Sequence, residues 1–236
     1  MNIAICGADR AFQDELRQRL SSYCGSRRLP LELFEYTDVR KMEADRRPVD
    51  IAFFDELPGP LYGIEAAREF KKRNPRVILI ITAEDSKRID DAFDIKAFRY
   101  FEKPVETQRL FASLDCAVKR IDESTVVFVH THTGEMLRIP AKKIVFVETS
   151  GRKTRVVTEN AEYSSAFKIS QWKKMLRASC FAFPHSSYIV NMRYVESFAK
   201  SKLTLKYPHG EYEVPVSANR QAEFKLHYLL FNNMHP

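Results

Sequence analysis

The 236-residue chain lacks any run of about 18 apolar residues, so the sequence predicts no membrane-spanning helix. Its first residues contain no basic stretch followed by a long apolar core, and we therefore expect no signal peptide and a cytoplasmic location. The cysteines, Cys6, Cys24, Cys116 and Cys180, form none of the close pairs that a zinc site needs. We expect them to be buried, reduced thiols. Internal repeats and low-complexity segments are also absent from the sequence.

Negative charge is scarce in the second half of the chain. Residues 1–123 contain 22 Lys and Arg against 23 Asp and Glu, whereas residues 124–236 contain 16 against 8, with no aspartate. All six histidines also lie in the second half. A basic excess confined to one half suggests a polyanionic partner for that half alone. A solvated basic surface without such a partner is the alternative.

Residues 1–121 alternate short apolar runs with segments of helical spacing, such as Phe12, Leu16 and Leu20. This alternation predicts an α/β doubly wound, flavodoxin-like domain, with five parallel strands covered by helices on both faces. Ligands of such folds bind beyond the C-terminal ends of the strands. The expected strands are 2–6, 31–36, 50–54, 77–81 and 97–101.

Three polar residues stand at the ends of these strands: Asp55, Thr82 and Lys103. An acid, a hydroxyl and an ammonium that converge on one spot suit an aspartyl phosphate, with Asp55 as phospho-acceptor and the other two binding phosphoryl oxygens. This spacing, with Gly63 eight residues after the acid, resembles the receiver domain of response regulators. The resemblance implies a switch in which Tyr100 follows the movement of Thr82.

The sequence departs from the receiver family where that family binds Mg²⁺. The adjacent pair of acids falls at Gly7 and Ala8, and Asp9 lies one residue further on. Mg²⁺ requires several oxygen ligands, and phosphoryl transfer depends on the metal to neutralise charge. We expect a weak Mg²⁺ site at Asp9 and Asp55, or none, and impaired phosphorylation. A displaced site that uses Asp9 or Glu56 is the alternative. A further hypothesis is that the lysine pairs directly with the acceptor and holds the domain in one state.

Residues 122–125 are predicted to be a short polar linker between a receiver domain at 1–121 and a second domain at 126–236. From residue 126, short runs rich in Val, Ile, Phe, Tyr and Thr alternate with turn signals, which indicates a mainly-β domain. Helices fit only residues 169–176 and about fourteen residues after Ser217, a good N-cap. So many short strands argue against a helix-turn-helix module, and recognition would come from loops.

Three loops of this domain are rich in basic or small polar residues: 150–155, 183–191 and 216–220. The segment HSSYIVN at 185–191 resembles the hallmark of the LytTR DNA-binding domain: a histidine, a small polar pair, an aromatic, two aliphatics and an asparagine. The segments IVFVET and VPVS, which precede the first and third loops, match as well. The resemblance covers about residues 126–231. It implies a mainly-β fold whose loops enter successive major grooves of promoter DNA.

We expect one group of residues to contact bases or nearby phosphates: Arg152, Lys153, Thr154 and Arg155 in the first loop, His185 and Ser186 in the second, and Asn219 and Arg220 in the third. Ala218 stands where the family has an arginine, so one of its two neighbours would have to read the base. An arginine with two hydrogen bonds to guanine would contribute about 1–3 kcal/mol of discrimination. A second group is expected to touch phosphate: Arg193, Lys200 and Lys202.

We therefore interpret the chain as a bacterial two-component response regulator and not as an enzyme. In this interpretation it is a phosphoprotein in which a receiver domain is joined to a DNA-binding domain. A histidine kinase is a candidate partner, and a homodimer on DNA is expected because two modest contacts gain through effective concentration. One alternative is a phosphorylation-independent scaffold that binds protein or RNA. The other is a metal site at His130 and His132, completed by His209 or His185, although no acids or cysteines stand at ligand spacing.

Overall fold

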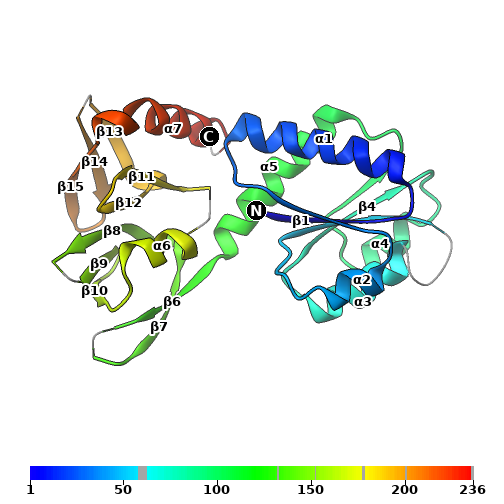
Figure 1. Ribbon diagram of the computed structural model, residues 1–236, viewed down its shortest axis with the longest axis horizontal. Helices are drawn as coiled ribbons and strands as arrows, with labels where there is room; N and C mark the ends of the chain where they lie inside the picture. Colours follow the sequence, from blue (N-terminus) through cyan, green and yellow to red (C-terminus); the bar gives the residue numbers. More distant parts are fainter. Residues whose placement is uncertain (58–62, 132, 152, 177–178, 200, 235–236) are drawn as a thin grey trace. The chain divides into compact units, whose positions relative to one another are not determined.

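The computed structural model describes residues 1–57, 63–131, 133–151, 153–176, 179–199 and 201–234 (Figure 1). Its contacts divide the chain into two units, 1–117 and 118–236. The N-terminal unit consists of β1 (Asn2–Cys6), α1 (Arg10–Arg27), β2 (Glu32–Tyr36), α2 (Val39–Ala44), β3 (Ile51–Asp55), α3 (Gly63–Arg73), β4 (Ile78–Ala83), α4 (Ile89–Asp94), β5 (Arg99–Glu102) and the beginning of α5 (Thr107–Ser124).

The N-terminal unit is built on one parallel sheet with the strand order β2-β1-β3-β4-β5. Helices α1 and α5 lie on one face of the sheet, and α2, α3 and α4 lie on the other (Figure 1). All residues of the central strands β1 and β3 are buried, as expected for strands covered on both sides. The predicted doubly wound fold is confirmed. Strand β3 pairs with β4 so that Asp55 lies opposite Thr82.

Helix α5 continues to Ser124, so residues 122–124 of the predicted linker 122–125 are helical. The carboxylate of Asp122, 2% exposed, accepts a hydrogen bond of 3.1 Å from the Ser179 backbone N–H and another from the Ser179 hydroxyl. A buried carboxylate needs such donors. The last turn of α5 is thereby fixed within the C-terminal unit.

The C-terminal unit is mainly β, as predicted, with three antiparallel sheets in the orders β10-β9-β8-β12-β11, β13-β14-β15 and β6-β7. Its elements are β6 (Val126–His130), β7 (Met136–Pro140), η1 (Ala141–Lys143), β8 (Ile144–Ser150), β9 (Lys153–Thr158), β10 (Glu162–Ser165), α6 (Ile169–Met175), β11 (Phe181–His185), β12 (Tyr188–Asn191), η2 (Met192–Tyr194), β13 (Val195–Phe198), β14 (Lys202–Tyr207), β15 (Gly210–Pro215), η3 (Ala218–Arg220) and α7 (Gln221–Met234).

One buried polar side chain, that of Asn191, helps to order this second core. The fully buried Asn191 side chain donates to the carbonyl of Ile144 at 2.9 Å and accepts from the Arg193 backbone N–H at 3.1 Å.

The sequence places Ser217 as the N-cap of the last helix, but α7 begins only at Gln221. Ser217 instead precedes the 3-10 turn η3 and makes no side-chain capping hydrogen bond, so that prediction is wrong.

None of the described helices combines the length and the apolar character needed to cross a membrane.

Candidate phospho-acceptor site and nucleic-acid interface

The candidate acceptor site of the N-terminal unit brings together three side chains at the ends of three neighbouring strands. Asp55 ends β3 and is 2% exposed. The Thr82 hydroxyl donates to Asp55 Oδ1 at 3.0 Å. Lys103, one residue beyond β5, places its Nζ 2.8 Å from Oδ1 and 3.1 Å from Oδ2 of the same carboxylate. The ammonium therefore contacts both acceptor oxygens directly.

Burial and pairing oppose each other at this site. Burial raises the pKa of Asp55 above its usual value, although the hydrogen bonds from Lys103 and Thr82 act in the opposite direction. For Lys103, burial alone lowers the pKa, but the hydrogen bonds and charges of Asp55 and Glu84 outweigh it, and the net pKa is raised. The Lys103 ammonium also lies 3.1 Å from Glu84 Oε1 and 4.3 Å from the centre of the Phe12 ring. Lys103 thus stays charged beside the acceptor.

The end of β1 approaches the acceptor more closely than a residue with a side chain allows. A Cβ added at Gly7 would lie 2.8 Å from Asp55 Cβ, a distance that real Cβ atoms essentially never show. The backbone of Gly7 is fixed there, because its N–H donates to the Tyr36 carbonyl at 3.0 Å and its carbonyl accepts from the buried Gln13 amide at 2.7 Å. Main chain therefore adjoins the acceptor at the position where the receiver family has a metal-binding acid.

Asp9, a predicted metal ligand, caps helix α1. Its Oδ1 accepts from the Phe12 backbone N–H at 3.1 Å, the usual role of an N-cap aspartate. Its other oxygen, Oδ2, lies 3.8 Å from Lys103 Nζ. The carboxylate is thus already engaged with a helix N-terminus and a cation.

Glu56, the other acid considered for a displaced metal site, is also engaged. It accepts from the Ile64 backbone N–H at 2.8 Å and from Arg88 Nη1 at 2.7 Å. Arg88 additionally binds Glu65 and Asp91, so one guanidinium connects acids from three segments of the unit. The pKa of Arg88 is raised, mainly by the hydrogen bond to Glu65.

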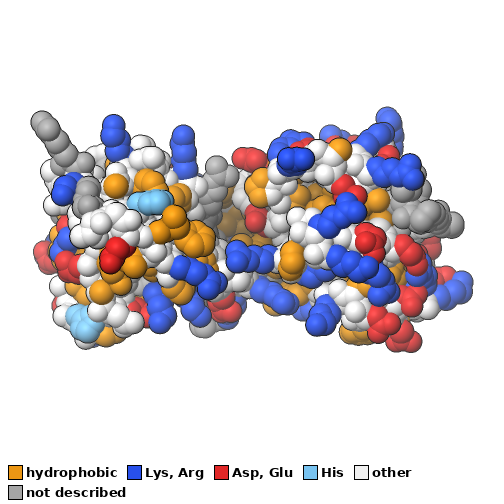
Figure 2. Space-filling view, turned by 90° about the horizontal axis from the view of Figure 1, so that it is seen from below, with side chains coloured by type: hydrophobic (Ala, Val, Ile, Leu, Met, Phe, Trp, Pro, Cys, Tyr) orange, Lys and Arg blue, Asp and Glu red, His pale blue; other side chains and the backbone are white. Residues whose placement is uncertain are grey.

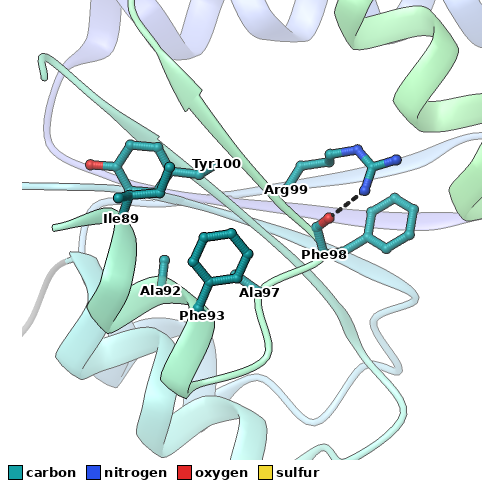
Figure 3. A pocket seen from close by; sticks show the side chains of 7 residues that line it. All are labelled: Ile89, Ala92, Phe93, Ala97, Phe98, Arg99 and Tyr100. Carbon is teal, nitrogen blue, oxygen red and sulfur yellow. Dashed lines mark hydrogen bonds between the residues drawn. The ribbon is translucent and has the colours of Figure 1, made fainter. Parts of the chain in front are cut away.

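Tyr100, the predicted switch aromatic, borders a pocket between α4 and β5. Its hydroxyl donates to the Asp85 carbonyl at 2.7 Å. Figure 3 shows the side chains that line this pocket, with the Phe93 ring between those of Tyr100 and Phe98 in this view. Phe93 is 69% exposed. The pocket has a volume of about 190 Å³ and is lined by Ile89, Ala92, Phe93, Ala97, Phe98, Arg99 and Tyr100.

Among the residues that the structure describes, no group of three or more His, Cys, Asp or Glu side chains is placed to hold a metal ion. His132, one of the histidines considered for a metal site, lies outside the described residues.

In the C-terminal unit, the three predicted recognition loops lie at the same end of the main sheet. The Thr149 backbone N–H, at the end of β8, donates to the Ser187 carbonyl between β11 and β12 at 2.9 Å. The Ser217 backbone N–H, just before η3, donates to the Pro184 carbonyl of β11, also at 2.9 Å. These two bonds connect the β8–β9, β11–β12 and η3 segments, which we call the loop end.

The first recognition loop is shorter than predicted, because β9 already begins at Lys153. Lys153 is exposed, whereas Arg152 lies outside the described residues. Thr154 points inward and is 2% exposed. Its hydroxyl donates to the Phe167 carbonyl at 2.7 Å and accepts from the Trp172 indole N–H at 3.1 Å. The prediction of DNA contact is wrong for Thr154, because its polar atom is used inside the core.

Arg155 lies within strand β9 and is held by two carboxylates. Its guanidinium is 2.6 Å from Glu148 and 3.0 Å from Glu162. It also lies 5.4 Å and 5.3 Å from the ring centres of Phe146 and Tyr212. The predicted turn position is therefore wrong for Arg155, and its charge is already balanced within the unit.

The second and third loops present polar groups at the loop end. The half-buried His185 accepts a hydrogen bond from the Ser187 backbone N–H on Nδ1 at 3.2 Å. Ser186 and Asn219 are exposed. The Arg220 guanidinium donates to the Phe183 carbonyl at 2.8 Å, which fixes its orientation.

The predicted phosphate contacts fall in different surroundings. Arg193 is exposed on η2, Lys202 pairs with Glu213, and Lys200 lies outside the described residues. Exposed pairs such as Lys202–Glu213 are weak and leave the lysine able to exchange partners.

On the face shown in Figure 2, the N-terminal unit at the right carries interspersed basic and acidic side chains.

Sequence reasoning missed one basic residue at the loop end, Lys173 of α6. Its Nζ lies 3.5 Å from the Ser186 carbonyl and 5.5 Å from the centre of the Phe183 ring. The signal was present as two adjacent lysines in the predicted helix 169–176. Nothing in the sequence indicates which of the two approaches a recognition loop.

The chain is similar in sequence to known regulatory proteins. Residues 134–228 match the LytTR family, described as the LytTr DNA-binding domain. The transcriptional regulatory protein NatR of Bacillus subtilis is 27% identical over 213 residues, which cover 86% of this chain and 91% of NatR. The sensory transduction protein LytT of the same organism is 26% identical over 197 residues, or 77% of this chain and 80% of LytT. A signal receiver domain structure from Pseudomonas fluorescens Pf-5 has 22% identity and a TM-score of 0.45, and it covers 50% of this chain and 94% of that one.

Proposed function

We propose that this chain, a DNA-binding response regulator of the LytTR type, binds promoter DNA through its loop end, as a homodimer and without Mg²⁺-dependent phosphorylation at Asp55. The observation that carries the DNA proposal is the convergence of three loops at one end of a basic unit. Lys153, Ser186 and Asn219 are exposed there, and Arg220 has a fixed orientation. Polar and basic side chains presented in this way can reach base edges in a major groove.

Affinity and sequence reading would come from different residues. The excess of 16 Lys and Arg over 8 Asp and Glu in residues 124–236 supplies attraction to phosphate, which depends on salt and not on sequence. Reading of bases is assigned to Arg152, His185 and Asn219, because Thr154 and Arg155 are engaged within the unit. Ala218, at the position of the family's arginine, leaves the third loop with Asn219 as its exposed polar side chain.

The donor set around Asp55 does not fit Mg²⁺. The metal requires about six oxygen ligands in octahedral geometry. Here Gly7 and Ala8 supply no carboxylates, Asp9 caps a helix, Glu56 binds Arg88, and an ammonium contacts both acceptor oxygens. We infer that Lys103 neutralises Asp55 in the absence of any metal and holds the receiver in one state. Regulation would then enter through dimerisation or another ligand, and a histidine kinase would be at most a poor donor to Asp55.

The test selects preferred sequences from a random DNA library with the full chain, then titrates the selected DNA against a scrambled sequence at several salt concentrations. Lys153→Ala is compared with Lys206→Ala, an equal change of charge at the far end of β14, where Lys206 pairs with Glu196. We expect the selected DNA to bind more tightly than the scrambled DNA, and Lys153→Ala to weaken both and reduce the salt slope by about 1. Equal binding of both DNAs by the wild-type chain would favour a scaffold role instead.

A further inference from the structure

Two basic side chains contact Phe183 at the loop end. Lys173 Nζ, from α6, lies 5.5 Å from the centre of the Phe183 ring. Arg220, from η3, donates through Nη1 to the Phe183 carbonyl at 2.8 Å. Both side chains are half-buried. Two cations from different elements thus both contact one residue.

Neither cation forms a salt bridge with an acid in the part of the chain that the structure describes, although Glu223 lines the same pocket as Arg220. Arg155, Lys202 and Lys206, by contrast, each contact a carboxylate of the same unit. Burial lowers the pKa of Lys173, and the positive charge of Arg220 lowers it further. The two charges therefore repel each other in partly desolvated surroundings, where Coulomb interactions are stronger than in water.

The position of this pair indicates its ligand. Lys173 Nζ is 3.5 Å from the carbonyl of Ser186, the exposed residue of the second recognition loop. Arg220 follows Asn219, the exposed residue of the third. A guanidinium oriented by one backbone bond keeps further N–H donors for an anion, and an ammonium adds a point charge. An anion bound between them would remove the repulsion.

We propose that Lys173 and Arg220 together bind one backbone phosphate of the DNA and thereby fix how the second and third loops enter the groove. This inference rests on the proposed DNA binding. It assigns a helix residue to the interface, and it makes Arg220 a phosphate ligand and not a reader of bases. Phosphate contacts position a protein on DNA but carry no sequence information.

The test uses the full chain with Lys173→Gln, Arg220→Gln and both together, beside Lys206→Gln as a control of equal charge. Fluorescence of the sole tryptophan, the buried Trp172 next to Lys173, reports whether α6 stays folded. Affinities for selected and scrambled DNA are measured at several salt concentrations. We expect each single variant to lose about tenfold in affinity for both DNAs, as for a lost charge-assisted hydrogen bond.

The double variant should lose much less than the product of the two single losses, because both side chains act on one phosphate. The proposal is overturned if Lys173→Gln binds like Lys206→Gln, if the single losses multiply, or if the loss for Arg220→Gln is confined to the selected sequence. Failure of the wild-type chain to bind either DNA would overturn the proposed function itself. The two failures are therefore distinguishable.

Discussion

At the scale of single residues, the acceptor site depends on the absence of a side chain. The backbone of Gly7 occupies space that a Cβ would need, 2.8 Å from Asp55 Cβ. The spacing of Asp55, Thr82 and Lys103 predicts their convergence from sequence, because strand ends meet at one edge of a parallel sheet. The close approach of Gly7 could not be predicted, since it depends on how tightly the Gln13 amide and the Tyr36 carbonyl hold the end of β1.

Gly7→Ala should therefore destabilise the N-terminal unit by about 1–3 kcal/mol, the usual cost of overpacking. Gly25→Ala is the matched control, because a Cβ there meets no atom within 4 Å and Gly25 lies inside helix α1. The control should gain about 0.5–1 kcal/mol from helix propensity. Urea unfolding followed by circular dichroism measures both, since tryptophan fluorescence reports only the C-terminal unit. Equal effects of the two changes would contradict the close packing at Gly7.

The acceptor carboxylate should oppose folding at neutral pH. Its pKa is raised in the folded chain, mainly by burial, so the charged form is less favourable folded than unfolded. This cost disappears as the pH falls through the raised pKa towards about 3.9, the value of an unfolded aspartate. Asp55→Asn should thus be more stable than wild type at pH 7, by a margin that shrinks on acidification. Urea unfolding at several pH values measures this margin, with Asp14→Asn as a surface control. A margin that stays constant from pH 7 to 4 would contradict this account.

At the scale of elements, the start of strand β9 in the β8–β9 hairpin could not be predicted from the sequence. Basic residues between two strands indicated a recognition loop at 150–155, but β9 begins at Lys153. Because side chains alternate along a strand, Lys153 is exposed and Thr154 points into the core. The sequence alone cannot locate this boundary, since Lys, Thr and Arg fit a turn and a strand edge equally well.

Thr154→Val tests this assignment, since it keeps the shape but removes one of the two acceptors of the Trp172 indole N–H, the other being the Ser165 hydroxyl. We expect a loss of about 1–3 kcal/mol in the free energy of unfolding, the cost of weakening a buried hydrogen-bond network. Affinity for DNA under folding conditions should stay unchanged. Lys153→Ala should behave in the opposite way, with weaker DNA binding and unchanged stability. Weaker DNA binding by folded Thr154→Val would restore Thr154 to the interface.

At the scale of the whole molecule, the sequence shows a clear division of charge. It separated a nearly neutral half from a basic one, and the family match falls in the basic half. The polar composition of residues 122–125 suggested a linker, yet the last turn of α5 covers residues 122–124. Composition could not show that Asp122 is buried and accepts hydrogen bonds from Ser179.

Binding as a homodimer predicts two chains on each DNA that carries two half-sites. The second contact becomes intramolecular once the first is made, so removal of one half-site should lower the affinity about a hundredfold. Analytical ultracentrifugation of the complex measures the stoichiometry, and titration of the shortened DNA measures the loss. One chain per DNA with equal affinity for one and two half-sites would contradict the dimer.

The central claim is that Lys103, and not a metal, neutralises Asp55, so that DNA binding does not depend on phosphorylation. The most direct test incubates the full chain with Mg²⁺ and a small phosphodonor, then reads its intact mass and its DNA affinity in the same sample. Asp55→Ala is the negative control, and an ordinary receiver that does label is the positive one. The account predicts no phosphoryl adduct and an unchanged affinity. An adduct that disappears in Asp55→Ala and changes the affinity for DNA would contradict it.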